Sequence, residues 1–201
     1  MKHVMVGLMA IFVVSASFGV RAEGDPSEGK KKFYTCAGCH AVPGYTNTYP
    51  TYHVPRIGGQ HADYVVSSLK AYQSDERHHG SMKGNAASLS EADMADIAAY
   101  VSKFRGMNAS LPVQGDPVAG KTKAATCAGC HTEDGNSENT LFPRLAGQYQ
   151  SYLIRALKDY KSGARSNPMM MGFASILSEA DMEDIAAYYA SQKKGLTVPR
   201  D

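Results

Sequence analysis

The stretch Cys36-Ala37-Gly38-Cys39-His40 occurs a second time, unchanged, as Cys127-Ala128-Gly129-Cys130-His131. Together the two copies contain all four cysteines of the chain. A Cys-x-x-Cys-His motif predicts covalent attachment of c-type haem, because its two thiols lie one helical turn apart and the next histidine can ligate the iron. Structural zinc and disulfides are the alternatives, and a disulfide has no use for the histidine. We therefore predict two covalent haem c groups, attached by Cys36, Cys39, Cys127 and Cys130, with His40 and His131 as axial iron ligands.

The first 22 residues have the pattern of an export signal. Lys2 gives a positive start, residues 4–20 are mostly apolar, and Val20-Arg21-Ala22 offers small residues where a signal peptidase reads. A retained membrane anchor is the alternative, because this apolar run approaches the length of a membrane span. We expect a cleaved signal peptide and a periplasmic protein, and no later segment is apolar enough to span a bilayer.

The charge balance bears on the class of partner. The whole chain has a formal net charge of +2, and removal of Lys2 and Arg21 with the signal leaves equal numbers of basic and acidic residues. The propionates of two haems then make the protein mildly acidic. Nucleic-acid binding needs a basic surface, so we expect no nucleic-acid partner.

An internal repeat organises the rest of the chain. Gly-Asp-Pro at 24–26 recurs at 115–117, and the Leu-Ser-Glu-Ala-Asp-Met segment at 89–94 recurs 88 residues later at 177–182. The first copy has three extra residues between its haem motif and Pro55. We predict a signal peptide at 1–22, a first domain at 23–105, a linker at 106–115 and a second domain at 116–201.

Each half is predicted to be all-α, with three helices. The first begins at an Asp-Pro pair (25–26 and 116–117), which suits a helix N-cap and first turn. The second begins near Gln60 and Gln148, and the third at the capping signatures of Ser90 and Ser178. No stretch alternates convincingly as a strand.

The ligand opposite each histidine decides what the haem does. Methionine raises the reduction potential, whereas a vacant position invites oxygen or peroxide chemistry. Met82 and Met170 are related by the 88-residue shift, and we predict them as the sixth ligands. Met169 and Met171 compete with Met170, but neither has a methionine counterpart in the first half.

Histidines are the rival ligands in the first half only. His78 or His79 could reach an iron there, but the second half has no histidine except that of its haem motif. Symmetry therefore favours methionine in both halves. We expect His53 and His61 at the surface or in hydrogen bonds, and Met94 and Met182 in the core.

These motifs resemble the cytochrome c4 family over nearly all of the chain after the signal. The resemblance implies two tandem class I cytochrome c domains, with paired haems at the domain interface and electrons passing between them. It also implies that Pro55 and Pro143 offer their carbonyls to the proximal histidines. Residues 45–53, with three tyrosines, are an asymmetric feature of the first half; they cover a haem edge, meet a partner or form a plain packed loop.

The resemblance implies an electron carrier between a membrane quinol-oxidising cytochrome complex and a terminal oxidase or reductase. We expect no catalytic residues and no enzyme activity, and loose membrane association is compatible with this role. A dihaem subunit of a periplasmic dehydrogenase, such as a sulfide-oxidising flavocytochrome, is the first alternative; peroxidase or nitric oxide chemistry at an open iron is the second. The two potentials, the natural donor and acceptor, and the oligomeric state stay open.

Overall fold

The computed structural model describes residues 24–107 and 111–200. The predicted signal peptide lies outside these ranges. Within them, none of the helices combines the length and the apolar character that a bilayer span requires.

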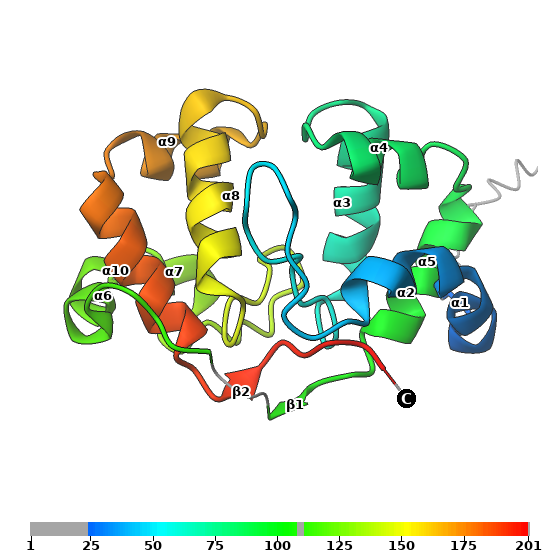
Figure 1. Ribbon diagram of the computed structural model, residues 1–201, viewed down its shortest axis with the longest axis horizontal. Helices are drawn as coiled ribbons and strands as arrows, with labels where there is room; N and C mark the ends of the chain where they lie inside the picture. The colour runs from blue at the N-terminus through cyan, green and yellow to red at the C-terminus, as the bar shows by residue number, and fades with distance from the viewer. Residues whose placement is uncertain (1–23, 108–110, 201) are drawn as a thin grey trace, which may run out of the picture.

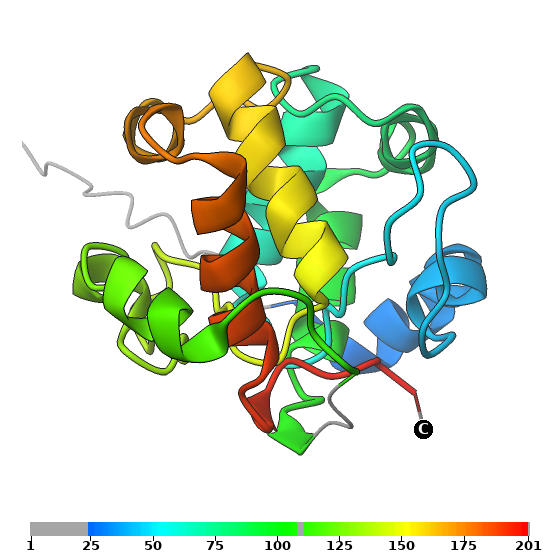
Figure 2. The ribbon, with the colours of Figure 1, turned by 60° about the vertical axis from the view of Figure 1, so that its left-hand side comes forward.

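Two halves with the same order of helices lie side by side (Figure 1). The first half contains α1 (Pro26–Lys32), α2 (Tyr34–His40), α3 (Ala62–Gln73), α4 (Gly80–Ala86) and α5 (Glu91–Val101). The second contains α6 (Pro117–Lys123), α7 (Ala128–His131), α8 (Gln150–Ser162), α9 (Pro168–Ser175) and α10 (Glu179–Ala190). A short antiparallel pair, β1 (Gly106–Met107) with β2 (Lys194–Gly195), joins the halves at one edge, and the turned view of Figure 2 shows it below the helices.

The prediction of three helices per half is wrong, because the described part of each half contains five. The helices α2, α4, α7 and α9 have only four to eight residues, which is too short to display a helical period in sequence. The pair β1–β2 was missed for the same reason, since each strand has two residues.

The predicted start signals are confirmed in the capping contacts. Asp25 and Asp116 accept hydrogen bonds from backbone N–H groups at the first turns of α1 and α6. Ser90 and Ser178 each form a complete capping box at the start of α5 and α10. Such contacts satisfy N–H groups that have no partner within the helix. The second helix of each half begins two residues later than predicted, at Ala62 and Gln150.

Two glycines allow the first and last helices of each half to cross closely. A Cβ atom on Gly29 would lie 1.9 Å from the carbonyl oxygen of Asp96, and one on Gly120 would lie 1.9 Å from that of Asp184. Backbone therefore packs on backbone where α1 meets α5 and where α6 meets α10. Met94 and Met182 are 1% exposed next to these crossings, which confirms them as core residues.

The interface between the halves repeats itself under the 88-residue shift. The Arg56 N–H donates to Gln148 Oε1 (2.8 Å), and Gln148 Nε2 donates back to the Arg56 carbonyl (2.8 Å). Arg144 and Gln60 make the same two contacts at 2.9 and 3.1 Å. All four residues are buried. The halves are therefore related by a pseudo-two-fold axis, with the haem motifs on either side of it.

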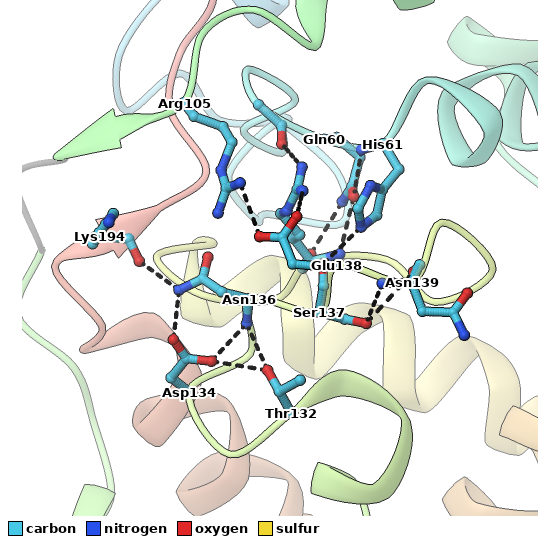
Figure 3. Close-up of polar contacts among 12 residues, drawn as sticks. Gln60, His61, Arg105, Thr132, Asp134, Asn136, Ser137, Glu138, Asn139 and Lys194 are labelled. Atoms are coloured by element: carbon cyan, nitrogen blue, oxygen red, sulfur yellow. Dashed lines mark hydrogen bonds and ion pairs between the residues drawn. The ribbon is translucent and has the colours of Figure 1, made fainter.

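Further contacts lock one edge of this interface. Arg105 forms an ion pair with Glu138 (3.0 Å), and the His61 ring donates to the Ser137 carbonyl (2.8 Å), as Figure 3 shows. His61 is buried, so of the two predicted environments it occupies the hydrogen-bonded one. The segment after β2 crosses to the first half, where Thr197 exchanges two backbone hydrogen bonds of 2.9 Å with Gly58. The position of one half relative to the other is thus fixed by an ion pair and by several hydrogen bonds along this edge.

Candidate functional site

One cavity of about 1180 Å³ runs between the halves and is lined by both. A pocket for a single small ligand typically measures about 300–1,000 Å³, so this volume suits more than one such molecule. Its walls include every residue that the sequence predicts to bind haem: Cys36, Cys39, His40, Pro55, Met82, Cys127, Cys130, His131, Pro143 and Met170. The structure therefore brings the two predicted sets together at a single site.

The two motif histidines have the geometry of iron ligands. His40 Nδ1 lies 3.0 Å from the Pro55 carbonyl oxygen, and His131 Nδ1 lies 2.9 Å from that of Pro143. Because a carbonyl only accepts, Nδ1 carries the proton and Nε2 keeps its lone pair for a metal. Burial lowers the pKa of both imidazoles and so favours the neutral ring that metal ligation requires.

The four cysteines lie at or within the short helices that end at these histidines. Cys36 and Cys39 lie in α2, Cys127 caps α7 and Cys130 lies inside it, and no disulfide joins any of the four. No group of three metal-binding His, Cys, Asp or Glu side chains exists among the described residues, so the zinc alternative gains no support.

The predicted methionine ligands lie at equivalent places on two equivalent helices. Met82 on α4 and Met170 on α9 both line the cavity and are half-buried. The Met82 N–H donates to the side chain of His79, and the Met170 N–H donates to that of Asn167, the residue equivalent to His79. Each methionine is therefore held one turn into a capped helix.

The competing ligands occupy less suitable places. Met169 lines the cavity but is 53% exposed, and Met171 does not line it. His79 also lines the cavity, yet its Nδ1 is engaged in capping α4, whereas His78 faces a small neighbouring cavity. Met171 and His78 thus lie outside the cavity lining, whereas Met169 differs from the two equivalent methionines in its exposure and His79 in its capping contact.

The asymmetric segment 45–53 forms a loop that lines the cavity and contacts the second half. His53 stacks on Tyr149 with ring centroids 4.7 Å apart and hydrogen-bonds Ser151 Oγ at 2.8 Å. Tyr52 is buried, whereas Tyr49 is 95% exposed. The loop lies between α3 and α8 in Figure 1. It therefore covers one side of the cavity and also braces the halves against each other.

Sequence reasoning gave no role to two arginines that also line this cavity, Arg77 and Arg165. The 88-residue shift aligns them, so the repeat contained a signal for both. An arginine that is present in both copies is easily taken for a surface residue, because charged side chains are mostly exposed. Only the structure shows that both arginines line the same cavity.

Comparison with known proteins agrees with this geometry. The sequence profile of the Cytochrome c family matches residues 26–104 and 118–193, which is one match on each half. The chain belongs to the cytochrome c family, of the two-domain cytochrome c4 type. Its two Cys-x-x-Cys-His motifs accordingly bind two covalent haem c groups.

Relatives and solved structures give the extent of the similarity. The chain is 32% identical over 170 residues to cytochrome c-552 of Acidithiobacillus ferridurans, covering 78% of this chain and 73% of that protein. It is 47% identical over 88 residues to cytochrome c4 of Pseudomonas aeruginosa, a match that spans 44% of each chain.

Among solved structures, cytochrome c4 of Acidithiobacillus ferrooxidans superposes with a TM-score of 0.70 at 31% identity, covering 79% of this chain and 99% of that one. Thiosulfate dehydrogenase (TsdBA) from Marichromatium purpuratum superposes with a TM-score of 0.72 at 26% identity. That match covers 82% of this chain and 40% of that one. The described fold is thus found both in a separate cytochrome and in part of a larger enzyme.

Proposed function

We propose that this protein is a periplasmic dihaem electron carrier that passes single electrons between partner proteins. The observation that carries the proposal is the single cavity, because both sets of haem-binding residues open onto it from opposite halves. Bound haem supplies an iron that alternates between the ferric and ferrous states. The polypeptide attaches the group, orients the imidazoles through the Pro55 and Pro143 carbonyls and limits access of water.

The sixth ligands in this proposal are Met82 and Met170. Equivalent positions on α4 and α9, equivalent capping of their N–H groups and partial burial against the cavity all support them. With both positions filled by thioether sulfur, neither iron has a free site for peroxide or nitric oxide. The chain then acts as a carrier rather than as an enzyme.

The test is a redox titration of the purified holoprotein with haem quantitation, on Met170→Ala and, as matched control, on the adjacent Met169→Ala. Met170→Ala should lower one midpoint potential and allow one ferrous iron to bind carbon monoxide, while Met169→Ala leaves both haems as in the parent. The reverse pattern would make Met169 the ligand. Carbon monoxide binding by the parent protein would contradict the carrier function itself.

For the partners, we propose a membrane quinol-oxidising cytochrome complex as donor and a terminal oxidase or reductase as acceptor. A second candidate is an electron-transfer subunit or acceptor of a periplasmic dehydrogenase, favoured by the superposition on thiosulfate dehydrogenase. Stopped-flow reduction separates the two. A carrier should be reduced by a quinol-oxidising complex without thiosulfate, whereas a dehydrogenase partner should be reduced by that enzyme only when its substrate is added.

A further inference from the structure

Arg77 and Arg165 meet at the pseudo-two-fold axis. Each follows the long central helix of its half, α3 or α8, and the two segments pair in antiparallel fashion at these residues. The His78 N–H donates to the Ala164 carbonyl (3.0 Å), and the Ser166 N–H donates to the Glu76 carbonyl (2.7 Å). Two arginines from opposite halves are thus held next to each other by backbone contacts.

Each guanidinium group also links the halves through its side chain. Arg77 lies over the ring of Tyr72 in its own half (4.5 Å) and donates to the Tyr152 hydroxyl of the other half. Arg165 lies over Tyr160 (4.5 Å) and donates to the Tyr64 hydroxyl at 2.5 Å. The pattern is the same on both sides of the axis, so it is a feature of the interface rather than of one half.

No carboxylate balances these two charges. Among the described residues, neither guanidinium forms an ion pair, although Arg105, Arg144 and Arg155 all do. Arg165 is only 8% exposed, and the like charge of Arg77 lies beside it. A buried charge is normally paired, because removal from water costs several kcal/mol (roughly) per ion. Arg165 is buried, Arg77 is half-buried and neither has an acidic partner, so the pair is suited to bind an anion from outside the polypeptide.

The pKa of the neighbouring Tyr64 reflects the positive charge of both arginines. Burial alone would raise the pKa of the Tyr64 hydroxyl, but the charges of Arg165 and Arg77 outweigh burial and lower that pKa below its ordinary value. The site is therefore electrostatically positive on the side where both arginines line the large cavity. Two covalent haems bring carboxylates into that cavity as their propionates, and a guanidinium matches a carboxylate with two parallel hydrogen bonds.

We propose that Arg77 and Arg165 together bind propionate carboxylates of the two haems, as one cationic site shared by both halves, and that this site raises the reduction potentials of both haems. Reduction adds a negative charge, which nearby cations stabilise. Because the arginines adjoin across the axis, each haem experiences both of them. The inference requires the two haems but not any particular redox partner.

The test uses Arg77→Gln and Arg165→Gln in the holoprotein, with Arg105→Gln as the control for loss of one arginine charge at an exposed ion pair. Both midpoints are measured by redox titration from pH 5 to pH 9. Arg77→Gln and Arg165→Gln should each lower the equilibrium constant for reduction of a haem about tenfold. This corresponds to a fall in midpoint potential of about 59 mV for a one-electron couple. Each of these cavity variants should move both midpoints, not one.

A pH profile distinguishes a bound carboxylate from a purely structural arginine. A propionate that loses its guanidinium partner becomes easier to protonate, so the midpoints of the cavity variants should become pH-dependent at mildly acidic pH. Arg77→Lys keeps the charge and should restore most of the potential. The Arg105→Gln variant should keep the parent profile.

Unchanged midpoints, or a shift confined to one haem with a flat pH profile, would overturn the shared site. Haem content of two per chain in that case would leave the haem assignment intact, whereas a colourless parent protein would remove the basis of both proposals. If Arg77→Gln yields no holoprotein, Tyr152→Phe replaces it. This variant frees the Arg77 guanidinium without removing its charge, so both midpoints should fall by a smaller amount, and parental potentials would count against the proposal.

Discussion

Replacement of Gln60 by alanine should open the interface between the halves. The Gln60 side chain is 5% exposed and makes three hydrogen bonds to backbone: Oε1 accepts from the N–H groups of Arg144 (2.9 Å) and His61 (3.0 Å), and Nε2 donates to the Arg144 carbonyl (3.1 Å). Gln60→Ala leaves these three buried groups without partners. An orphaned buried group costs about 1–3 kcal/mol, so we expect a loss of at least about 3 kcal/mol.

That loss can be measured against a matched control. Gln150 also makes three side-chain hydrogen bonds to backbone, two with Gln114 and one with Glu183, but in an exposed place where water can replace them. Gln150→Ala should therefore cost less than about 1 kcal/mol. Guanidinium chloride unfolding of the holoproteins, followed by far-ultraviolet circular dichroism and haem absorbance, gives both values.

The pseudo-symmetry makes the prediction stricter. Gln148 repeats the contacts of Gln60, so Gln148→Ala should destabilise the protein by a similar amount. The double variant should lose less than the sum, because the first substitution already admits water to the interface. In thermal unfolding, a loss of about 3 kcal/mol corresponds to about 6–12 °C for a chain of this size. Equal stability of Gln60→Ala and Gln150→Ala would refute the reasoning.

Three further predictions concern single positions. Gly29→Ala should destabilise the fold by about 3 kcal/mol or more, since its Cβ would meet a backbone carbonyl of α5 at 1.9 Å, whereas Gly84→Ala in α4 has open space and should be neutral or stabilising in the same unfolding assay. His79→Ala should cost about 1 kcal/mol and weaken the methionine-to-iron absorption band of one haem through loss of the α4 cap; His79→Asn, which copies Asn167, should rescue both, and a normal band in His79→Ala would contradict a positioning role. Burial lowers the pKa of His61 in the folded state, so the free energy of unfolding should fall as pH drops through about 6.5, the unfolded value, and His61→Asn should reduce that slope in denaturant titrations between pH 8 and pH 5; an unchanged slope would show that His61 does not contribute.

The exposed apolar residues of α9 and its surroundings distinguish the halves further. Met169, Phe173 and Ile176 are 53%, 40% and 81% exposed, and the 88-residue shift places Ser81, Asn85 and Ser88 at the equivalent positions of the first half. The fold itself therefore does not require apolar side chains there. The two halves share a plan for holding haem but present different surfaces around it.

Local sequence motifs were sufficient to predict where the haems are attached and where the main helices begin. Cys-x-x-Cys-His acts through residues that are one helical turn apart, and the capping signatures of Ser90 and Ser178 act through contacts three residues apart. The 88-residue repeat then selected Met82 and Met170 from ten methionines. That choice stays a prediction until a ligand is measured. Short helices such as α4 and α9 were not predicted, because about two turns are too few to show a helical period.

By itself the sequence determined that there are two covalent haem motifs, all-α halves and one repeated plan, because each of these depends on spacing within a few residues or on comparison of one copy with the other. Tertiary structure alone decided that both sets of haem-binding residues face one cavity, that Arg77 reaches Tyr152 and that the loop at 45–53 rests on α8. These partners are 75 to 98 residues apart, and they meet only because two buried surfaces dock about a pseudo-two-fold axis. No local preference encodes that docking, since it depends on the shapes of both surfaces at once.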